Sequence, residues 1–158
     1  MSQRNLFVTA ANAFIDANEP ERALEMLDKC QACISSDRYP LESIILGFSS
    51  NDFSVIEMVT DYYVLGETEK ARNLALEIFN GLIESAGFYL EFYDYAKSDF
   101  ELCGNYIYYL QDALTRAGDK ELAQKMDSNF NALLNYVLGK GPAADPEGQL
   151  EVTDSSQE

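Results

Sequence analysis

The chain has 158 residues, and its 27 acidic and 11 basic residues give a formal net charge of −16. This length favours one domain with a real core, while the negative charge disfavours nucleic acid and anionic membranes as partners, because phosphate groups would be repelled. The sequence has no histidine, so it lacks the commonest general base and metal ligand, and we expect no cofactor. No apolar run approaches the roughly 18 residues that a membrane span requires.

Two helices are predicted within residues 4–35. Asn18 is expected at the turn between them, because asparagine tolerates the left-handed conformation better than most residues. Pro20 suits the first turn of the second helix, where its missing N–H is no loss. The packed face of this helix is marked at helical spacing by Ala23, Leu27, Cys30 and Ile34.

The cysteines are interpreted as structural. Cys30 and Cys33 form a CxxC pair, but the pair lies inside a predicted helix and not at a helix N-terminus, where the dipole would lower the pKa of a thiol. We interpret both as small buried hydrophobic residues. A redox role is the less favoured alternative, and the distance of Cys103 along the chain, with no histidine, disfavours a zinc site.

Residues 35–52 interrupt the helical pattern. Pro40 pushes the residue before it toward an extended conformation and stops the preceding helix. The apolar stretch 41–48 is expected to pack back over the first helix pair as a short turn or helix. Residues 49–52 are expected to form a loop that caps the next helix.

A second helix pair is predicted over residues 52–86. Gly66 can adopt the left-handed conformation that closes a helix, because it has no Cβ. Thr68 is expected to cap the next helix through its hydroxyl, and Ala71 is expected where two helices come close together. A continuation of this helix, with a kink near Gly87, leads into an aromatic stretch.

This aromatic stretch holds nine rings, from Phe88, Tyr89, Phe92, Tyr93, Tyr95, Phe100, Tyr106, Tyr108 and Tyr109. Clustered aromatic residues form core packing more often than binding sites, and tyrosine suits a partly wet boundary. We therefore favour packing, with an aromatic platform for a sugar or a peptide as the alternative.

A third helix pair is predicted over residues 99–138. Gly118 is expected to end its first helix and Asp119 to cap its second. The expected buried stripe of the second helix is Ala123, Met126, Phe130, Leu133 and Val137. We expect a helical domain over residues 4–138, and a disordered acidic tail over 139–158, where glycine, proline, serine and acids accumulate.

The three helix pairs align on a small residue in each second helix. These residues are Ala23, Ala71 and Ala123, each five positions after its turn residue (Asn18, Gly66 or Gly118) and nine after a large residue (Phe14, Tyr62 or Leu114). This pattern resembles the tetratricopeptide repeat. The resemblance implies an all-α fold of three antiparallel tetratricopeptide-like hairpins that stack as an α-α superhelix. Inserted segments separate the hairpins, because the spacings exceed the usual period of about 34 residues.

A second, narrower resemblance covers about residues 4–138. The succession of residues 5–30, 59–79 and 110–126, with the tyrosine-rich segment between, is similar to the C-terminal region of a family of bacterial multi-spanning membrane proteins related to protein O-mannosyltransferases of the GT-C type. This resemblance implies that the chain is the soluble end of a longer protein at the bacterial inner membrane, on a side that stays unresolved. Any glycosyl transfer would belong to the membrane part, so no catalytic residue carries over.

The favoured function is a non-catalytic protein-interaction or assembly module with an unidentified protein or peptide partner. By the tetratricopeptide resemblance, the binding face lies on the first helix of each pair. Its candidate residues are Asn12, Asp16, Thr60, Tyr63, Asp112, Thr115 and Arg116, beside apolar positions such as Val8, Phe53 and Ile56. Packing of these apolar positions against the inserted segments is an equal alternative.

The alternative function is a small sugar-binding or hydrolytic domain. Glycoside hydrolysis uses two carboxylates at a defined separation, and Glu57 and Asp61 lie four residues apart, on one face of a predicted helix. Glu91 and Asp94 are the other candidate acids, and the tyrosine cluster would stack on the sugar. In an acidic helical protein such pairs are expected without function, so this hypothesis ranks second.

Overall fold

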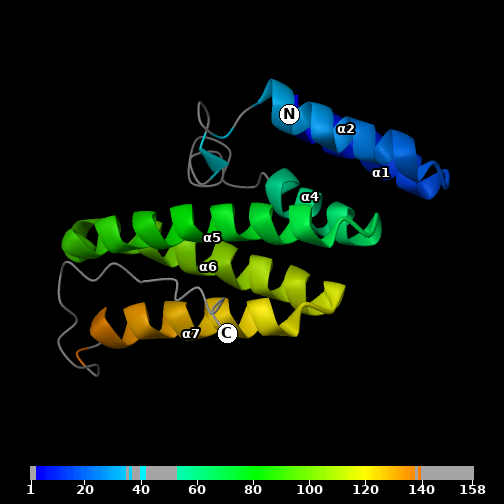
Figure 1. Ribbon diagram of the computed structural model, residues 1–158. Coiled ribbons are helices and arrows are strands. Elements are labelled where there is room, and N and C mark those ends of the chain that lie inside the picture. Colours follow the sequence, from blue (N-terminus) through cyan, green and yellow to red (C-terminus); the bar gives the residue numbers. More distant parts are fainter. Residues whose placement is uncertain (1–2, 35, 37–39, 42–52, 138, 140–158) are drawn as a thin grey trace, which may run out of the picture.

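The structure, a computed structural model, describes residues 3–34, 36, 40–41, 53–137 and 139 (Figure 1). The regular elements of these residues are helices, in the order α1 (Gln3–Asp16), α2 (Pro20–Cys33), α4 (Ser54–Val64), α5 (Thr68–Glu91), α6 (Tyr93–Ala117) and α7 (Lys120–Val137). This confirms the prediction of an all-α fold. The predicted loop and cap over 49–52, most of the apolar stretch 41–48 and nearly all of the predicted tail lie outside the described residues.

Three turns with the same hydrogen-bond pattern join α1 to α2, α4 to α5 and α6 to α7. Their central residues have positive φ, namely Asn18 (58°), Gly66 (79°) and Gly118 (94°). In each turn, the N–H of the residue after the turn residue donates a hydrogen bond to the carbonyl of the large residue five positions earlier. These bonds run from Glu19 to Phe14 (2.8 Å), from Glu67 to Tyr62 (2.9 Å) and from Asp119 to Leu114 (2.9 Å). This is the Schellman geometry of a helix C-terminus, and it confirms the three turn residues predicted from the sequence.

One of the two predicted caps is wrong. The N-cap residue of α5 is Glu67, no side chain makes a capping hydrogen bond there, and Thr68 is the first helical residue. The cap of α7 is confirmed, because Asp119 Oδ1 accepts a hydrogen bond from the Leu122 N–H at 3.3 Å. The reason for the difference is the turn, which places Thr68 one position too late for its hydroxyl to reach a free N–H.

Two helices extend beyond the bounds of the predicted pairs 52–86 and 99–138: α5 ends after residue 86, and α6 begins before residue 99. α5 continues past residue 86, through Gly87, to Glu91 without a kink, and its buried face extends as far as Ala86. The chain breaks instead at Phe92 (φ −122°, ψ 31°), and α6 has a second irregularity at Ala96 (φ −114°, ψ 23°). The kink predicted near Gly87 is therefore wrong.

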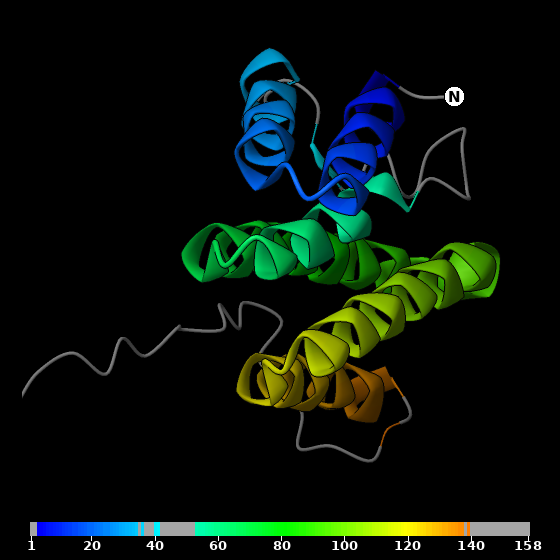
Figure 2. The same ribbon diagram turned by 90° about the vertical axis from the view of Figure 1, so that its right-hand side faces the viewer.

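The helices stack in successive layers. α1 and α2 form the top of the view, α4 and α5 lie below them, and α6 and α7 follow (Figures 1 and 2). Each helix packs on its partner across the turn, α5 also packs on α6, and α1 contacts α4, which contacts α6. The first helices of the three pairs therefore follow one another along one side of the stack.

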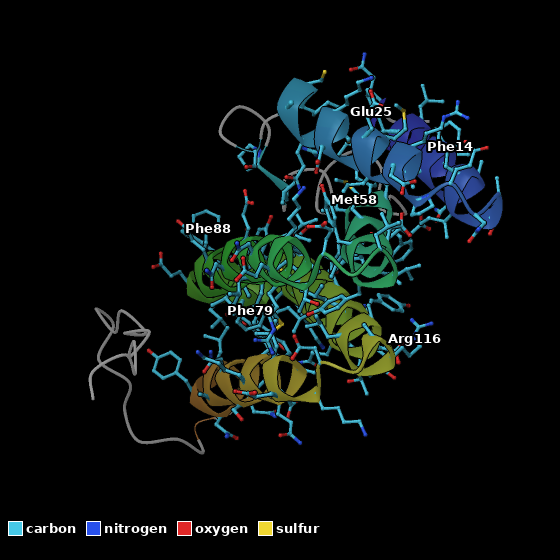
Figure 3. The ribbon with its side chains drawn as sticks, turned by 45° about the vertical axis from the view of Figure 1, so that its right-hand side comes forward. Phe14, Glu25, Met58, Phe79, Phe88 and Arg116 are labelled. Atoms are coloured by element: carbon cyan, nitrogen blue, oxygen red, sulfur yellow. The ribbon has the colours of Figure 1, made fainter. Side chains whose placement is uncertain are left out.

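The core fills the spaces between these layers. Its largest fully buried side chains are Tyr62, Tyr106, Leu27, Met58, Ile78, Leu82, Ile107, Leu110, Leu114, Met126 and Val8. Met58 lies between α4 and the first pair, and Phe79 lies between α5 and the layer of α7 (Figure 3). The aligned alanines Ala23, Ala71 and Ala123 are all buried, as expected where helices approach closely. None of the described helices is both long and apolar enough to span a membrane.

The aromatic stretch divides between core and surface. Phe100 and Tyr106 are buried, as the packing interpretation expects, but Phe88, Phe92, Tyr95, Tyr108 and Tyr109 are exposed. The rings of Phe88 and Phe92 lie 5.5 Å apart at the end of the stack where α5 gives way to α6. Packing therefore explains only part of this cluster.

The cysteines are free in the described part of the chain, with Cys30 and Cys103 buried and Cys33 exposed. The interpretation of Cys33 as a buried residue is wrong, because Cys33 lies off the face of α2 that Ala23, Leu27 and Cys30 bury. Burial raises the pKa of the Cys30 thiol and raises the pKa of Cys103 to about 12. Both buried thiols are therefore protonated and unreactive at neutral pH.

Candidate functional site

A groove of about 740 Å³ runs between the three first helices. It is lined by Asn12 of α1, by Phe53, Ile56, Glu57, Thr60, Asp61, Tyr63 and Val64 at or in α4, and by Tyr109, Ala113, Arg116 and Ala117 of α6. Seven of these twelve residues are apolar or aromatic, and five are polar or charged, so the groove combines apolar surface with polar groups that can orient a ligand.

The structure brings four of the seven predicted face residues to this groove. Asn12, Thr60, Tyr63 and Arg116 line it. Asp112 and Thr115 instead line a separate hollow of about 360 Å³ between α6 and α7. Asp16 is exposed and lines neither hollow.

The apolar face positions also divide. Phe53 and Ile56 line the groove, whereas Val8 is 1% exposed and belongs to the core. The prediction of Val8 on the binding face is therefore wrong, because α1 turns that position toward its neighbouring helices. Val8 is buried, but its predicted packing against the inserted segments is not tested, because most of residues 35–52 lie outside the described residues.

One ion pair and one hydrogen bond hold two side chains of the groove in place. Arg116 is paired with Asp112 one helical turn away, with an Nη2–Oδ2 distance of 2.5 Å, so its charge is already balanced. Tyr63 donates its hydroxyl proton to Asp119 at 2.6 Å, which, with burial as the larger cause, raises the pKa of Tyr63 to about 12. The Tyr63 side chain is thus held in place and presents its ring to the groove.

Asp61 is the most unusual residue of the groove. Its side chain lines the hollow, yet the residue is only 5% exposed, and its Oδ2 atom has no hydrogen-bond partner among the described residues. Burial, and to a lesser extent the negative charge of Glu57, raise the pKa of Asp61 to about 7. Asp61 is therefore close to half protonated at neutral pH.

Of the other three candidate acids, only Glu57 lies in the groove with Asp61. Glu57 lines the groove with Asp61 but is exposed. Glu91 and Asp94 are also exposed, and neither lines the groove. They lie near Phe88, where α5 ends, and Figure 3 shows Phe88 and Arg116 at opposite ends of the α5–α6 layer.

Tyr109, Ala113 and Ala117 line the groove but were not predicted to do so. The sequence held a signal for them, because Tyr109, Ala113, Arg116 and Ala117 have the spacing of one helix face. The predicted face of α6 was rotated by about one position, since only the packing of α6 on α4 fixes its rotation. The Phe53 and Tyr109 rings are in edge contact, with centroids 5.2 Å apart, where α6 packs on the start of α4.

Comparison with known proteins found no protein-family model, no curated protein and no solved structure that matches this chain. In the described residues, no group of three or more cysteine, aspartate, glutamate or histidine side chains could hold a metal ion. What the groove can do chemically therefore has to be inferred from its own side chains.

Proposed function

We propose that this chain is a protein-interaction module built from three tetratricopeptide-like hairpins, and that the groove between α1, α4 and α6 binds a peptide segment of a partner protein. The observation that carries this proposal is the groove of about 740 Å³ formed by the first helices of all three pairs. Concave surfaces of this kind are what stacked helical repeats use for binding.

The repeated turn supports the hairpin assignment. The three turns share one hydrogen-bond pattern, the three aligned alanines are buried, and the first helices contact one another in series. The long helices α5 and α6, which pack along each other, are a departure from a regular array. They lengthen the second and third pairs without closing the groove.

The chemistry of the groove supports a peptide. Phe53, Ile56 and Tyr109 offer apolar surface, and Asn12 and Thr60 offer polar groups along the same hollow. Apolar surface together with polar groups suits a segment with alternating apolar and polar side chains.

Selection of peptides from a random phage-display library tests the proposal. We expect the enriched peptides, made synthetically, to shift the backbone amide signals of Thr60, Tyr63 and Tyr109 in the ¹⁵N–¹H spectrum of the labelled protein. Thr60→Trp should fill the groove and weaken binding. Ala32→Trp is the matched control, because Ala32 is exposed on α2 and does not line the groove. Peptides that bind both variants equally, or that shift only other regions, would contradict the proposal.

The resemblance to the C-terminal region of GT-C-related membrane proteins supports an extension of this proposal. In this extension the module is the soluble part of a longer bacterial inner-membrane protein, and it recruits a partner to that protein. Sequencing the gene upstream of the Met1 codon tests it. A continuous reading frame that encodes membrane spans is the expected result, and an in-frame stop codon directly upstream would contradict it.

A sugar-binding or hydrolytic domain is the second candidate function. It is favoured by Asp61, whose pKa of about 7 suits a general acid near neutral pH, and by the tyrosine rings beside it. Incubation with a panel of aryl glycosides separates the two functions. Hydrolysis that is lost in both Asp61→Asn and Glu57→Gln would support the second candidate. If the protein hydrolyses none of the glycosides, a hydrolytic function is contradicted.

A further inference from the structure

Asp61 lacks the partner that a buried carboxylate normally has. Buried polar atoms in folded proteins are nearly always hydrogen-bonded, and a buried charge is costly unless it is paired. Asp61 Oδ2 is buried without such a partner in the described residues, in a side chain that lines the groove. Because Oδ2 is covered, a ligand in the groove reaches it only when the Asp61 side chain turns toward the hollow, and that turn would give the oxygen the hydrogen bond that it lacks.

Three cations of the central and third helix pairs are paired with other acids. Arg116, the only basic residue among those that line the groove, is paired with Asp112. On α5, Lys70 is bound to Asp28 and Arg72 is bound to Asp119. The protein therefore supplies no free cation to Asp61 from these residues.

We infer that the groove selects a partner peptide that carries a lysine side chain, whose ammonium group is bound by the carboxylates of Asp61 and Glu57. This inference rests on the proposed peptide-binding function and names the chemistry of its partner. A cation is favoured over an anion because Glu57 stands one helical turn from Asp61, so an incoming positive charge relieves the repulsion between the two acids. The net charge of −16 would also attract a basic partner.

Lysine fits this site better than arginine. A guanidinium group prefers a bidentate fork to two oxygens, whereas an ammonium group is a compact point charge, and only the Oδ2 atom of Asp61 is buried without a partner. Ile56 and Tyr109 on the groove walls offer apolar surface to the methylene stem of a lysine.

Binding should depend on pH, because the ligand binds the ionised form of Asp61. The titratable or charged groups that line the groove are Glu57 and Tyr63 from α4 and Tyr109 and Arg116 from α6, while α1 contributes only Asn12 and α5 contributes none. Arg116 is paired with Asp112 and the pKa of Tyr63 is raised to about 12, whereas the pKa of Asp61 is raised to about 7. Affinity should therefore fall about tenfold from about pH 8 to about pH 6, as Asp61 takes up a proton.

Synthetic peptide mixtures with one fixed central residue between randomised positions test the inference. The fixed residue is lysine, arginine, norleucine or Nε-acetyl-lysine, and the readout is the apparent affinity from amide shifts of groove residues. We expect the lysine mixture to bind about tenfold more tightly than the norleucine and acetyl-lysine mixtures. Asp61→Asn should remove this preference and the pH dependence, and Glu57→Gln should reduce the preference.

Asp94→Asn is the matched control, since it removes the same charge at an exposed position outside the groove, and it should leave both effects intact. Circular dichroism verifies that all variants are folded. Equal binding of the lysine, norleucine and acetyl-lysine mixtures would overturn the inference and leave the peptide-binding function standing, and tighter arginine binding would overturn the choice of lysine. If no mixture shifts the groove residues, both the inference and the proposed function fail.

Discussion

Arg72 of α5 and Asp119 at the start of α7 form a bidentate ion pair, with Nε–Oδ2 and Nη2–Oδ1 distances of 2.5 and 2.9 Å. Tyr63 donates to the same carboxylate, so the second and third helix pairs meet at one acid. On the other side of α5, Lys70 and Tyr62 share Asp28 of α2 in the same way. A basic residue of α5 and a tyrosine of α4 thus tie the central pair to each neighbouring pair.

The two junctions differ in burial, and this predicts a difference in stability. The Asp119 side chain is 5% exposed, whereas Asp28 is 45% exposed and its partner Lys70 is 41% exposed. Asp119→Asn loses a charge-assisted pair and weakens the cap of α7, so the free energy of unfolding should fall by about 1–3 kcal/mol. Asp28→Asn should cost less than about 1 kcal/mol, since solvent screens exposed pairs. Urea unfolding followed by circular dichroism measures both values.

The cost of Asp119→Asn should also depend on pH. Hydrogen bonding to Arg72, more than any other cause, lowers the pKa of Asp119 to about 2. Because the folded state binds the proton less tightly than the unfolded state, the stabilisation is present above about pH 4 and is lost as the pH falls through about 2. The difference between the unfolding curves of wild type and Asp119→Asn should therefore shrink as the pH falls below about 4 and vanish below about pH 2, and a constant difference down to pH 2 would contradict this account.

The raised pKa of Asp61 predicts the opposite dependence of stability on pH. Its pKa is raised to about 7 from a usual value of 3.8, so the folded state binds the proton more tightly than the unfolded state. Its favourable contribution to stability is complete below about pH 4 and is lost as the pH rises to about 7. Asp61→Asn should therefore increase the free energy of unfolding by on the order of 2–4 kcal/mol at pH 8.

The same substitution should have little effect near pH 4, where Asp61 is neutral in the folded protein. Glu57→Gln provides a comparison, because it removes a neighbouring charge from an exposed position and should give only a small gain at pH 8. A loss of stability in Asp61→Asn at pH 8 would show that the ionised carboxylate has a favourable partner, and would remove the basis for ligand uptake by Asp61.

Local signals in the sequence were enough to predict the helix pairs. Asn18, Gly66 and Gly118 marked the turns, and the alanine after each turn marked the packed face of the second helix. The end of α5 carried no such signal, since neither glycine nor proline occurs at Phe92. Around that break the Phe88 ring contacts the Phe92 ring and the Tyr93 ring contacts the Phe100 ring, and the helical pattern predicts neither contact.

The candidate site was only partly predictable for a similar reason. α4 packs against α1, α5 and α6, so it is buried on most sides and its pattern does not show which side faces the groove. Glu57 and Asp61 look alike in the sequence, but only Asp61 is covered by the neighbouring helices. The predicted face of α4 was correct, since Thr60 and Tyr63 both line the groove, whereas α1 and α6 each brought only one predicted residue to it, Asn12 and Arg116.

Two glycine substitutions should have effects of opposite sign. Gly66 has φ +79°, a conformation that L side chains rarely adopt, whereas Gly87 lies inside α5 and an added Cβ would meet nothing within 4 Å. Gly66→Ala should therefore lower the free energy of unfolding by about 1 kcal/mol, and Gly87→Ala should raise it by about 0.5–1 kcal/mol. Thermal unfolding gives the order, and equal effects would show that the Gly66 turn is not left-handed in solution.

Overpacking at the aligned alanines tests the close approach of the helices. Ala71 is fully buried between layers, so Ala71→Leu adds a side chain where no space exists and should cost about 1–3 kcal/mol. Ala32→Leu is the matched control, because Ala32 is exposed on α2 and leucine keeps high helix propensity. Urea unfolding measures the free energy of unfolding of both variants. If Ala71→Leu costs no more than Ala32→Leu, the helices around Ala71 leave room for a larger side chain and the close approach is contradicted.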